Sequence, residues 1–411
     1  MSYLISNEIK MNKIRFYTKI LFILVVFLIY QKLNFFSHQK FEDVKLQLLY
    51  QSNLYIEQKP AKIILVWNDL YGQENWGFSR TPYKDFRDMN CYQTNCLVTD
   101  DKSKITEADA LMFLGDHLGM TIYPNVTRPK NQRWVFVEGE APCGAWMNHF
   151  QKWESAFNWT QTYKLDSDIP MLYGDYCRRK QPKPLDVDSI VKPKRKLATW
   201  FVSNCYYTSE RRFYIKELMK YMPIDVYGGC SFMFNQSNIC HKNETERCLK
   251  LIEKNYKFYF SFENSLEKDY ITEKYFKVLQ MNVVPVVRGD GNYSAVGPPY
   301  SFINTNDFKT PKDLADYLKY LDKNDNEYVK YLRWKGTYKI DRLDKSCWKV
   351  EPSWCKLCRK VNNPYEVVSH YKNITKWFGT CRKATDINRN FYKKEVKNTE
   401  EKREEDTKKI R

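Results

Sequence analysis

The residues with the clearest chemical potential lie in the segment FENSLEKDYITEKYF, residues 262–276. An apolar run predicts a strand that ends at Asn264, and a helix then begins near Thr272. Thr272 could cap that helix, which would place Glu273 and Lys274 in its first turn. A helix N-terminus attracts anions, and a lysine there adds a full positive charge. The pattern favours an anion site, although a capping threonine followed by two solvated charges is the simpler explanation of a lone Thr-Glu-Lys.

The charge of the whole chain is compatible with an anionic ligand. Its 67 Lys and Arg residues exceed its 49 Asp and Glu residues, which gives a formal net charge of +18. A basic surface can serve nucleic acid, an anionic membrane or an anionic small molecule. Apart from residues 192–196, no Lys/Arg block of the nucleic-acid type stands out. We therefore expect no nucleic-acid partner.

The N-terminal region predicts a membrane anchor. Residues 20–30 are apolar without interruption, and extending the run to 16–36 gives the ~17–25 residues that a membrane helix needs. Basic residues before the run predict a cytosolic tail over 1–15. The polar, patternless residues 37–60 suit a stem. A cleaved signal peptide is the alternative, but no small-x-small cleavage site follows the apolar run.

Cysteines and glycosylation sequons predict the compartment. The chain has 12 cysteines, an even number, and all of them lie beyond the predicted anchor. Six Asn-x-Ser/Thr sequons occur, at Asn125, Asn158, Asn235, Asn243, Asn292 and Asn373. Together with the anchor, they predict a single-pass type II membrane protein whose remaining chain lies in an oxidising, glycosylating lumen.

The role of the cysteines has two interpretations. Cys355 and Cys358 have the spacing of half a zinc site, which His370 and Cys381 could complete. The lumenal setting and the even count favour disulfides instead. The disulfide candidates are Cys91, Cys96, Cys347, Cys355, Cys358 and Cys381. Cys91 with Cys96 is the most local pairing, and the connectivity of the others cannot be deduced from the sequence.

Short apolar runs that end in polar or glycine residues predict buried parallel strands. In the first half, residues 61–190, they lie at 62–69, 110–116 and 133–140. In the second half, residues 191–350, strands are expected at 197–204, 224–229, 256–264 and 282–289, with helices at 209–221, 269–280 and 311–323. Ser209 is the expected N-cap of the first helix. Ligands should collect at the carboxyl ends of such strands.

Three further segments complete the predicted organisation. The proline-rich and basic stretch 181–196 is typical of an interdomain linker. Residues 351–392 form a C-terminal segment that contains cysteines. Residues 393–411 are charged and lack an apolar pattern, so a disordered tail is expected there.

The segment 262–276 closely resembles the signature of the α1,3/α1,4-fucosyltransferase family, in which FENS and a short spacer precede Asp-Tyr-Ile/Val-Thr-Glu-Lys, an aromatic-rich helix and VVPVV. The resemblance extends over about residues 61–360 and includes FVSNC, IDVYGGC, VFVEGEAP and FNWTQTYKLDSDI. It implies a two-domain GT-B fold of α/β class, with two Rossmann-like domains facing a cleft. It also implies a Golgi enzyme that moves L-fucose from GDP-fucose, with inversion, to the 3-hydroxyl of a GlcNAc in a glycan.

The resemblance also assigns roles to residues. It implies donor binding by Ser203, Asn204, Arg211, Asn264, Tyr270, Glu273 and Lys274. Arg211 and Lys274 would neutralise the departing GDP. Glu140, in Glu-Ala-Pro, aligns with the proposed general base of the family. Glu138 would share a strand face with Glu140 and remains a rival base.

The donor half matches the family pattern nearly throughout, whereas the acceptor half departs from it. Ala141 replaces a usual Ser, Lys164 stands where Arg is commoner, and Met171 with Leu172 replaces a usual Val-Pro. The acceptor therefore stays open between antennal N-acetyllactosamine or N,N'-diacetyllactosediamine units and the chitobiose core of N-glycans. An inactive lumenal glycan-binding protein and an enzyme that uses a UDP-sugar are the alternatives of another class.

A metal is not expected to be required. No Asp-x-Asp of the metal-binding kind lies at the donor site, although manganese could stimulate the enzyme. Asp166 and Asp168 have that spacing but lie in the other half. A hydrogen-bonding role is expected for this pair.

Overall fold

The computed structural model of the 411-residue chain describes residues 60–143, 151–205, 208–237, 239–240, 245–340 and 351–387. The predicted cytosolic tail, the anchor at 16–36, the stem up to residue 59 and the tail at 393–411 lie outside these described residues. Within the described ranges, no helix is both long enough and apolar enough to cross a bilayer.

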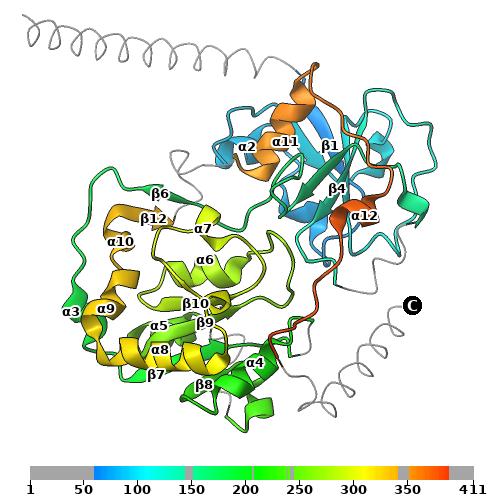
Figure 1. Cartoon of the computed structure of the whole chain (residues 1–411). Helices are drawn as coiled ribbons and strands as arrows, with labels where there is room; N and C mark the ends of the chain where they lie inside the picture. The colour runs from blue at the N-terminus through cyan, green and yellow to red at the C-terminus, as the bar shows by residue number, and fades with distance from the viewer. Residues whose placement is uncertain are drawn as a thin grey trace, which may run out of the picture. The chain divides into compact units, whose positions relative to one another are not determined.

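Five parallel strands form the first sheet in the order β2-β1-β3-β4-β5 (Figure 1). They are β1 (Lys62–Val66), β2 (Cys96–Thr99), β3 (Ala110–Leu114), β4 (Arg133–Glu138) and β5 (Trp159–Thr162). Every residue of β3 is buried, because both faces of the sheet are covered. The three apolar runs of the first half are therefore strands, as the sequence predicts.

The second sheet repeats this topology. It has the order β11-β10-β9-β7-β8, with all neighbouring strands parallel. Its strands are β7 (Lys196–Phe201), β8 (Ile224–Tyr227), β9 (Tyr256–Phe262), β10 (Val284–Arg288) and β11 (Ile303–Asn304). In both sheets the chain order reverses between the first and third strands, which is where open α/β sheets bind ligands. The α/β class with two parallel sheets is confirmed.

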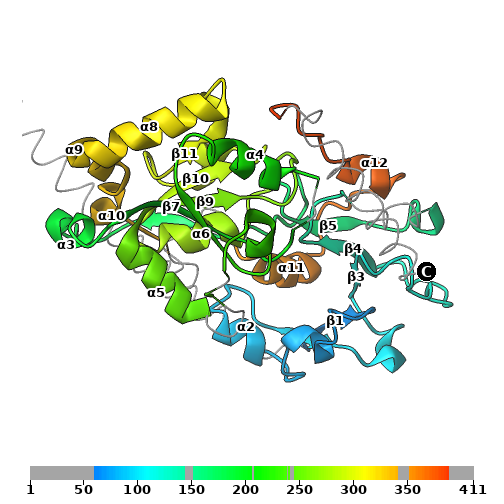
Figure 2. The ribbon, with the colours of Figure 1, turned by 90° about the horizontal axis from the view of Figure 1, so that it is seen from below.

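Helices cover both faces of the second sheet (Figures 1 and 2). On one face, α4 (Arg211–Leu218) and α8 (Pro311–Lys323) share a core cluster with β7, β9 and β10. On the other face lie α5 (Thr245–Asn255) and α6 (Glu273–Leu279). Thr310 caps α8 in a reciprocal capping box with Asp313.

The predicted N-cap of α4 is wrong. The helix begins at Arg211 after Glu210, which adopts a left-handed conformation with φ of 51° and caps without its side chain. Ser209 lies one residue before the N-cap position, and its hydroxyl donates to the carbonyl oxygen of Glu263 at 2.9 Å. The bond joins the start of α4 to the end of β9 instead.

Shorter elements connect these layers. In the described part of the chain, the remaining α-helices are α2 (Lys84–Asp88), α3 (Val187–Val191), α7 (Tyr293–Val296), α9 (Asp325–Tyr328), α10 (Trp334–Thr337), α11 (Ser353–Asn362) and α12 (Ile374–Phe378). Strands β6 (Tyr176–Arg178) and β12 (Tyr338–Ile340) form an antiparallel pair. The stretch predicted as a linker, 181–196, contains α3 and the first residue of β7.

The C-terminal segment returns to the first half before it reaches the second again (Figure 1). Buried residues of α11 join the core on one face of the first sheet, and Ile374 and Phe378 of α12 join the core on the other face. The chain then runs to the second half, where Arg382 forms a bidentate ion pair with Asp290 at 2.6 and 2.7 Å. Residues 374–387 therefore connect the cores of both halves.

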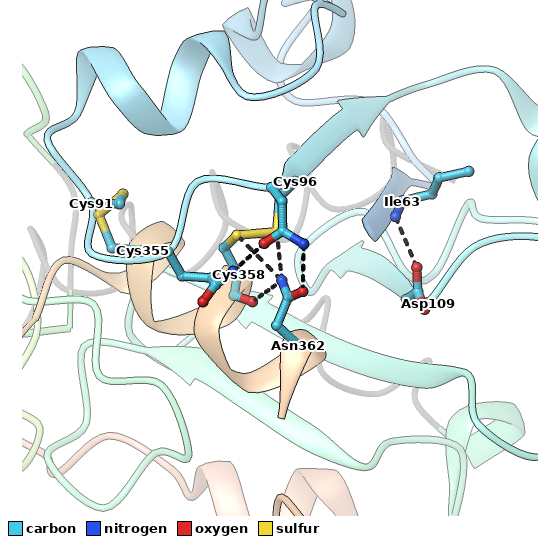
Figure 3. Close-up of a disulfide and its surroundings, with 9 residues drawn as sticks. Ile63, Cys91, Cys96, Asp109, Cys355, Cys358 and Asn362 are labelled. Atoms are coloured by element: carbon cyan, nitrogen blue, oxygen red, sulfur yellow. Dashed lines mark hydrogen bonds between the residues drawn. A yellow bond between two sulfur atoms is a disulfide. The ribbon is translucent and has the colours of Figure 1, made fainter. Parts of the chain in front are cut away.

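Disulfides attach α11 to the first sheet (Figure 3). Cys91 pairs with Cys355, and Cys96 pairs with Cys358. The local pairing of Cys91 with Cys96 is therefore wrong. Cys355 and Cys358 are spaced i, i+3 on one helix face and can reach both partners at once. Because their sulfurs are used in these bonds, they are not zinc ligands here.

Among the pairs whose two cysteines both lie in the described residues, three more disulfides join Cys143 with Cys381, Cys205 with Cys230, and Cys240 with Cys248. Candidate Cys347 lies outside the described residues. The bond from Cys143 to Cys381 holds the loop after β4 against the C-terminal segment.

Loss of both α11 disulfides should destabilise the protein far more than loss of either one. They span separations of 264 and 262 residues. Either bond alone joins the same two segments, so the second closes only a short additional loop. Loop-closure entropy gives about 5 kcal/mol for the long loop and about 2 kcal/mol for a short one. Cys96→Ser with Cys358→Ser should therefore cost about 2 kcal/mol, and the fourfold serine variant about 7 kcal/mol, which exceeds the sum of the two separate losses.

Urea unfolding of both variants measures this difference. Cys240→Ser with Cys248→Ser is the matched control, because its separation of 8 residues closes a short loop from the outset. If the loss in unfolding free energy for both α11 disulfides equals the sum of the losses for each one alone, the two disulfides do not substitute for each other and the prediction is wrong.

Candidate active site

Arg211 lies where the chain order of the second sheet reverses. Its guanidinium donates to the carbonyl oxygen of Phe262, the last residue of β9, at 2.8 Å. It also donates to the carbonyl oxygen of Asn204, which follows β7, at 2.9 Å. The side chain lies over the ring of Trp200, 5.6 Å from its centroid. These contacts fix a permanent positive charge at the edge where such sheets bind ligands.

Ser203 and Asn204 are exposed in the loop after β7. Gly228, directly after β8, faces this loop with φ of +91°, and a Cβ there would lie 2.5 Å from the carbonyl oxygen of Val202. The N–H of Gly229 reaches Ser203 Oγ at 3.4 Å. The close approach of the two loops therefore requires glycine at 228.

Glu263 organises the start of α6. The residue follows β9 directly and is fully buried. Its carboxylate accepts hydrogen bonds from the Thr272 N–H and hydroxyl, both at 2.8 Å. Thr272 is the N-cap of α6, as the sequence predicts. A buried carboxylate thus fixes the residue that precedes Glu273 and Lys274.

Lys274 lies beside two carboxylates. Its Nζ lies 3.4 Å from Glu263 Oε2 and 3.1 Å from Glu273 Oε1. Burial opposes the ammonium, but the two carboxylates outweigh it and raise the pKa of Lys274. The positive charge of Arg211 lowers the pKa of Lys274, which indicates that the two cations lie close to one another. Lys274 is therefore a charged lysine beside Arg211.

The first half contributes Glu140, just beyond the end of β4. The hydroxyl of Tyr270 donates to Glu140 Oε2 at 2.8 Å, and Asn264 Nδ2 reaches the same oxygen at 3.4 Å. Both partners come from the second half. Among the described residues, the hydrogen bonds to this carboxylate end on Oε2, so Oε1 is the oxygen that can face a substrate.

The halves interlock around this contact. Tyr270 is completely buried and belongs to a core cluster made mostly of first-half side chains, with Tyr163 edge-on at 4.9 Å. Burial raises the pKa of its hydroxyl well above the usual range, so it stays a hydrogen-bond donor. Nearby, Lys164 forms a buried ion pair with Glu267 at 3.1 Å. Tyr270, which the resemblance assigns to donor binding, contacts Glu140 in this structure.

Glu138 has a different environment from Glu140. It is buried at the end of β4, and its two oxygens accept the backbone N–H groups of Glu140 and Asp116, both at 2.8 Å. Gly115 leaves room for it, since a Cβ there would lie 2.7 Å from Glu138 Oε2. Burial raises the pKa of Glu138 well above its usual range, and the charge of Asp116 adds to the effect. Glu138 therefore positions the backbone of Glu140.

The Asp166–Asp168 pair is not part of this site. Asp168 accepts hydrogen bonds from Thr160, from the Ser369 hydroxyl at 2.6 Å and from the Tyr371 hydroxyl at 2.7 Å. In the described part of the chain, no group of three or more His, Cys, Asp or Glu side chains could hold a metal ion. Asp168 thus ties the C-terminal segment to β5.

Two residues of this site, Glu263 and Tyr173, were not predicted from the sequence. A carboxylate directly after seven buried residues was the available signal for Glu263. Tyr173 donates to the carbonyl oxygen of Gly139 at 2.8 Å and so supports the loop that carries Glu140. Its contact is formed only in the folded chain, and the local sequence carries no sign of it.

A carboxylate of one α/β half that contacts the half carrying Arg211 and Lys274 is the arrangement expected of a two-domain group-transfer enzyme. Two family models match the chain. Residues 59–174 match "Fucosyltransferase, N-terminal", and residues 191–377 match "Glycosyltransferase family 10 (fucosyltransferase) C-term". The chain belongs to the fucosyltransferases of glycosyltransferase family 10.

Several characterised proteins are similar to this chain. The glycoprotein 3-α-L-fucosyltransferase A of Drosophila melanogaster is 32% identical over 84% of this chain, which covers 66% of the fly protein. A human 4-galactosyl-N-acetylglucosaminide 3-α-L-fucosyltransferase is 32% identical over 80% of this chain and 83% of its own length. A solved α1,3-fucosyltransferase with GDP-fucose is 17% identical, with a TM-score of 0.46 over 75% of this chain and 93% of that chain.

Proposed function

We propose that the protein transfers L-fucose from GDP-fucose to the 3-hydroxyl of a GlcNAc in a glycoprotein or glycolipid glycan, with inversion. Glu140 is the general base, and Arg211 and Lys274 neutralise the leaving GDP. The observation that carries the proposal is the contact of Glu140 with Tyr270 and Asn264, since it brings a carboxylate of the first half to the donor half. The names of the relatives support fucose as the transferred group and a glycoprotein or N-acetylglucosaminide glycan as the acceptor.

The chemistry follows from these positions. The acceptor hydroxyl attacks the anomeric carbon of fucose on the face opposite GDP, and its proton passes to Glu140 Oε1. The new carbon–oxygen bond forms while the bond to the β-phosphate oxygen breaks, and GDP leaves with the bonding electrons. Lys274 and Arg211 stabilise the charge that develops on the diphosphate. Ser203, Asn204 and Glu273 complete the proposed donor site.

A transfer assay with the purified full-length chain tests this function. GDP-fucose should support turnover on N-acetyllactosamine, N,N'-diacetyllactosediamine or a chitobiose-core N-glycan, and this panel separates antennal from core acceptors. An excess of UDP should compete far less well than GDP. Absence of transfer to every acceptor, or turnover with a UDP-sugar instead, would overturn the proposal.

We further propose that turnover requires no divalent metal, because two side-chain cations already face the leaving group. Activity should therefore persist in excess EDTA, whether or not manganese stimulates it. Complete loss in EDTA with recovery in manganese would contradict this expectation.

We also propose that the protein is a Golgi type II membrane protein with an uncleaved anchor at residues 16–36. The apolar run, the paired cysteines and the exposed sequon residues Asn125, Asn235, Asn292 and Asn373 support this location. Asn158 is half-buried, and Asn243 lies outside the described residues. Protein purified from cells should migrate faster in gel electrophoresis after glycosidase treatment. An N-terminus found by sequencing beyond residue 36 would contradict the uncleaved anchor.

A further inference from the structure

The second half contains a cavity of about 460 Å³ that is separate from the residues assigned to the donor. Parts of α3, α10 and the β6–β12 pair line it (Figure 1). Ser189 precedes β7 in the chain and Asn282 comes just before β10, so the cavity lies at the amino edge of the second sheet. Leu279, the last residue of α6, also lines it, whereas Lys274 lies in the first turn of that helix. The cavity and the proposed donor site therefore lie at opposite ends of α6 and of the sheet.

Basic residues dominate the charged lining of this cavity. Four of them line it, namely Arg179, Lys183, Lys335 and Lys339. No carboxylate is among the lining residues that the structure describes. The charge of Glu253 acts on Lys335 from outside this lining, and its carboxylate already accepts the backbone N–H of Asn282 at 2.8 Å. The lining therefore carries an excess of positive charge, which favours an anionic ligand.

Arg179 and Lys183 have hydrogen-bond donors that the protein does not use. Arg179 Nε donates to the carbonyl oxygen of Lys335 at 2.9 Å, which fixes the guanidinium beside α10. Among the described residues, its two terminal nitrogens make no hydrogen bond, and neither Arg179 nor Lys183 forms an ion pair with a carboxylate. Arg179 is half-buried and Lys183 is exposed, so a ligand can reach both. The free edge of a guanidinium suits two oxygens of a phosphate, a sulfate or a carboxylate.

Lys335 adds a third cation at the inner end of the cavity. Its Nζ donates to the carbonyl oxygen of Leu279, where α6 ends. Burial lowers the pKa of Lys335 to about 8, with an opposing contribution from Glu253 and a further lowering by the charge of Arg179. The two cations therefore repel one another, and an anion between them would offset this repulsion.

The remaining lining is largely apolar and includes Leu185, Tyr338 and Ile340. The volume of the cavity falls within the roughly 300–1,000 Å³ that pockets for small molecules occupy. An inorganic anion alone would leave most of this space unfilled. The cavity therefore suits an anion that carries an organic group about the size of one sugar ring.

We propose that this cavity binds the phosphate monoester of a sugar-sized molecule, with Arg179 and Lys183 holding the phosphate oxygens. A phosphate monoester brings three acceptor oxygens and a charge of about −1.5 to −2 at neutral pH, which matches several cations better than a single carboxylate does. A soluble sugar phosphate and the headgroup of a phosphorylated inositol lipid share this chemistry. The ligand takes no part in the proposed transfer reaction, so this site does not depend on the proposed function.

Calorimetric titration of the full-length chain tests the site, with excess GDP present so that the proposed donor site is occupied. Glucose 6-phosphate and glycerophosphoinositol 4-phosphate are the two probes, and unphosphorylated glucose is the control. At least one probe should bind with a Kd of about 1 mM or lower, and glucose should not bind. The probe that binds more tightly identifies the soluble or the lipid source of the ligand.

A pair of double variants separates this cavity from the general positive charge of the protein. Arg179→Gln with Lys183→Gln should weaken binding of the probe about 10-fold or more, because charge-assisted hydrogen bonds are lost. Lys309→Gln with Lys323→Gln is the matched control, since it removes two positive charges at exposed positions that do not line the cavity. Binding to the control should stay within about twofold of the wild type.

A second measurement uses the wild-type protein and does not depend on the folding of a variant. Chemical acetylation of lysines, followed by mass spectrometry, should modify Lys183 more slowly when the probe is bound, and Lys309 at an unchanged rate. The proposal is overturned if neither probe binds, if both double variants lose affinity equally, or if the probe leaves the acetylation of Lys183 unchanged.

Discussion

Replacement of Glu140 by glutamine is expected to reduce fucose transfer by about 10²–10⁴-fold while GDP-fucose still binds. Glutamine keeps the size of the side chain and can still accept the hydrogen bond from Tyr270, which links the two halves. It cannot take the proton of the acceptor hydroxyl. Steady-state transfer rates, together with calorimetric titration of GDP-fucose, measure the two effects separately.

Glu138→Gln is the matched control, two residues away on the same strand end. The carboxylate of Glu138 holds two backbone N–H groups and is buried, so its role is to position Glu140. A glutamine retains one of these two acceptors, and we expect a loss of about tenfold or less. If Glu138→Gln is inactive and Glu140→Gln is active, the assignment of the base is wrong, although the family assignment stands.

Lys274→Ala is expected to weaken donor use by about 10²–10³-fold, because loss of a cation that faces a diphosphate costs on the order of 2–4 kcal/mol. The effect should be seen in GDP affinity and in turnover, with little change in acceptor binding. The start of α6 should remain intact, since Thr272 still donates two hydrogen bonds to Glu263. Calorimetric titration with GDP and single-turnover kinetics measure the loss.

Lys277→Ala provides the comparison on the same helix. Lys277 is exposed and lies one turn further along α6, away from Glu263. Its removal should change GDP affinity by less than about twofold, because an exposed charge is screened. Unchanged GDP affinity and near-normal turnover in Lys274→Ala would refute the role given to the Thr-Glu-Lys segment.

The strands and the N-cap of α6 could be predicted from the sequence, because they depend on residues that are close together in the chain. The apolar runs became β1, β3, β4, β7, β8, β9 and β10, because a strand buried on both faces must be continuously apolar. The N-cap of α6 followed from Thr272 for the same local reason. The cap of α4 did not, because the helix begins only after Glu210, and the Ser209 hydroxyl instead bonds to Glu263, far away in the chain.

The contacts that assemble the site join residues distant in sequence. Tyr270 and Glu140 are separated by 130 positions, and no local pattern shows that a tyrosine of one half enters the core of the other. The disulfides of Cys91 and Cys96 reach α11 for the same reason: the helix folds back onto the first sheet.

The most direct test of the central claim is the linkage and anomeric configuration of the product. The enzyme, GDP-β-L-fucose and the acceptor that proves active should be incubated together, and the purified product analysed by NMR. The account predicts an α-linked fucose on O3 of the GlcNAc, because the hydroxyl attacks from the face opposite GDP while Glu140 takes its proton. A β-linked fucose, fucose on another hydroxyl, or release of free fucose alone would contradict it.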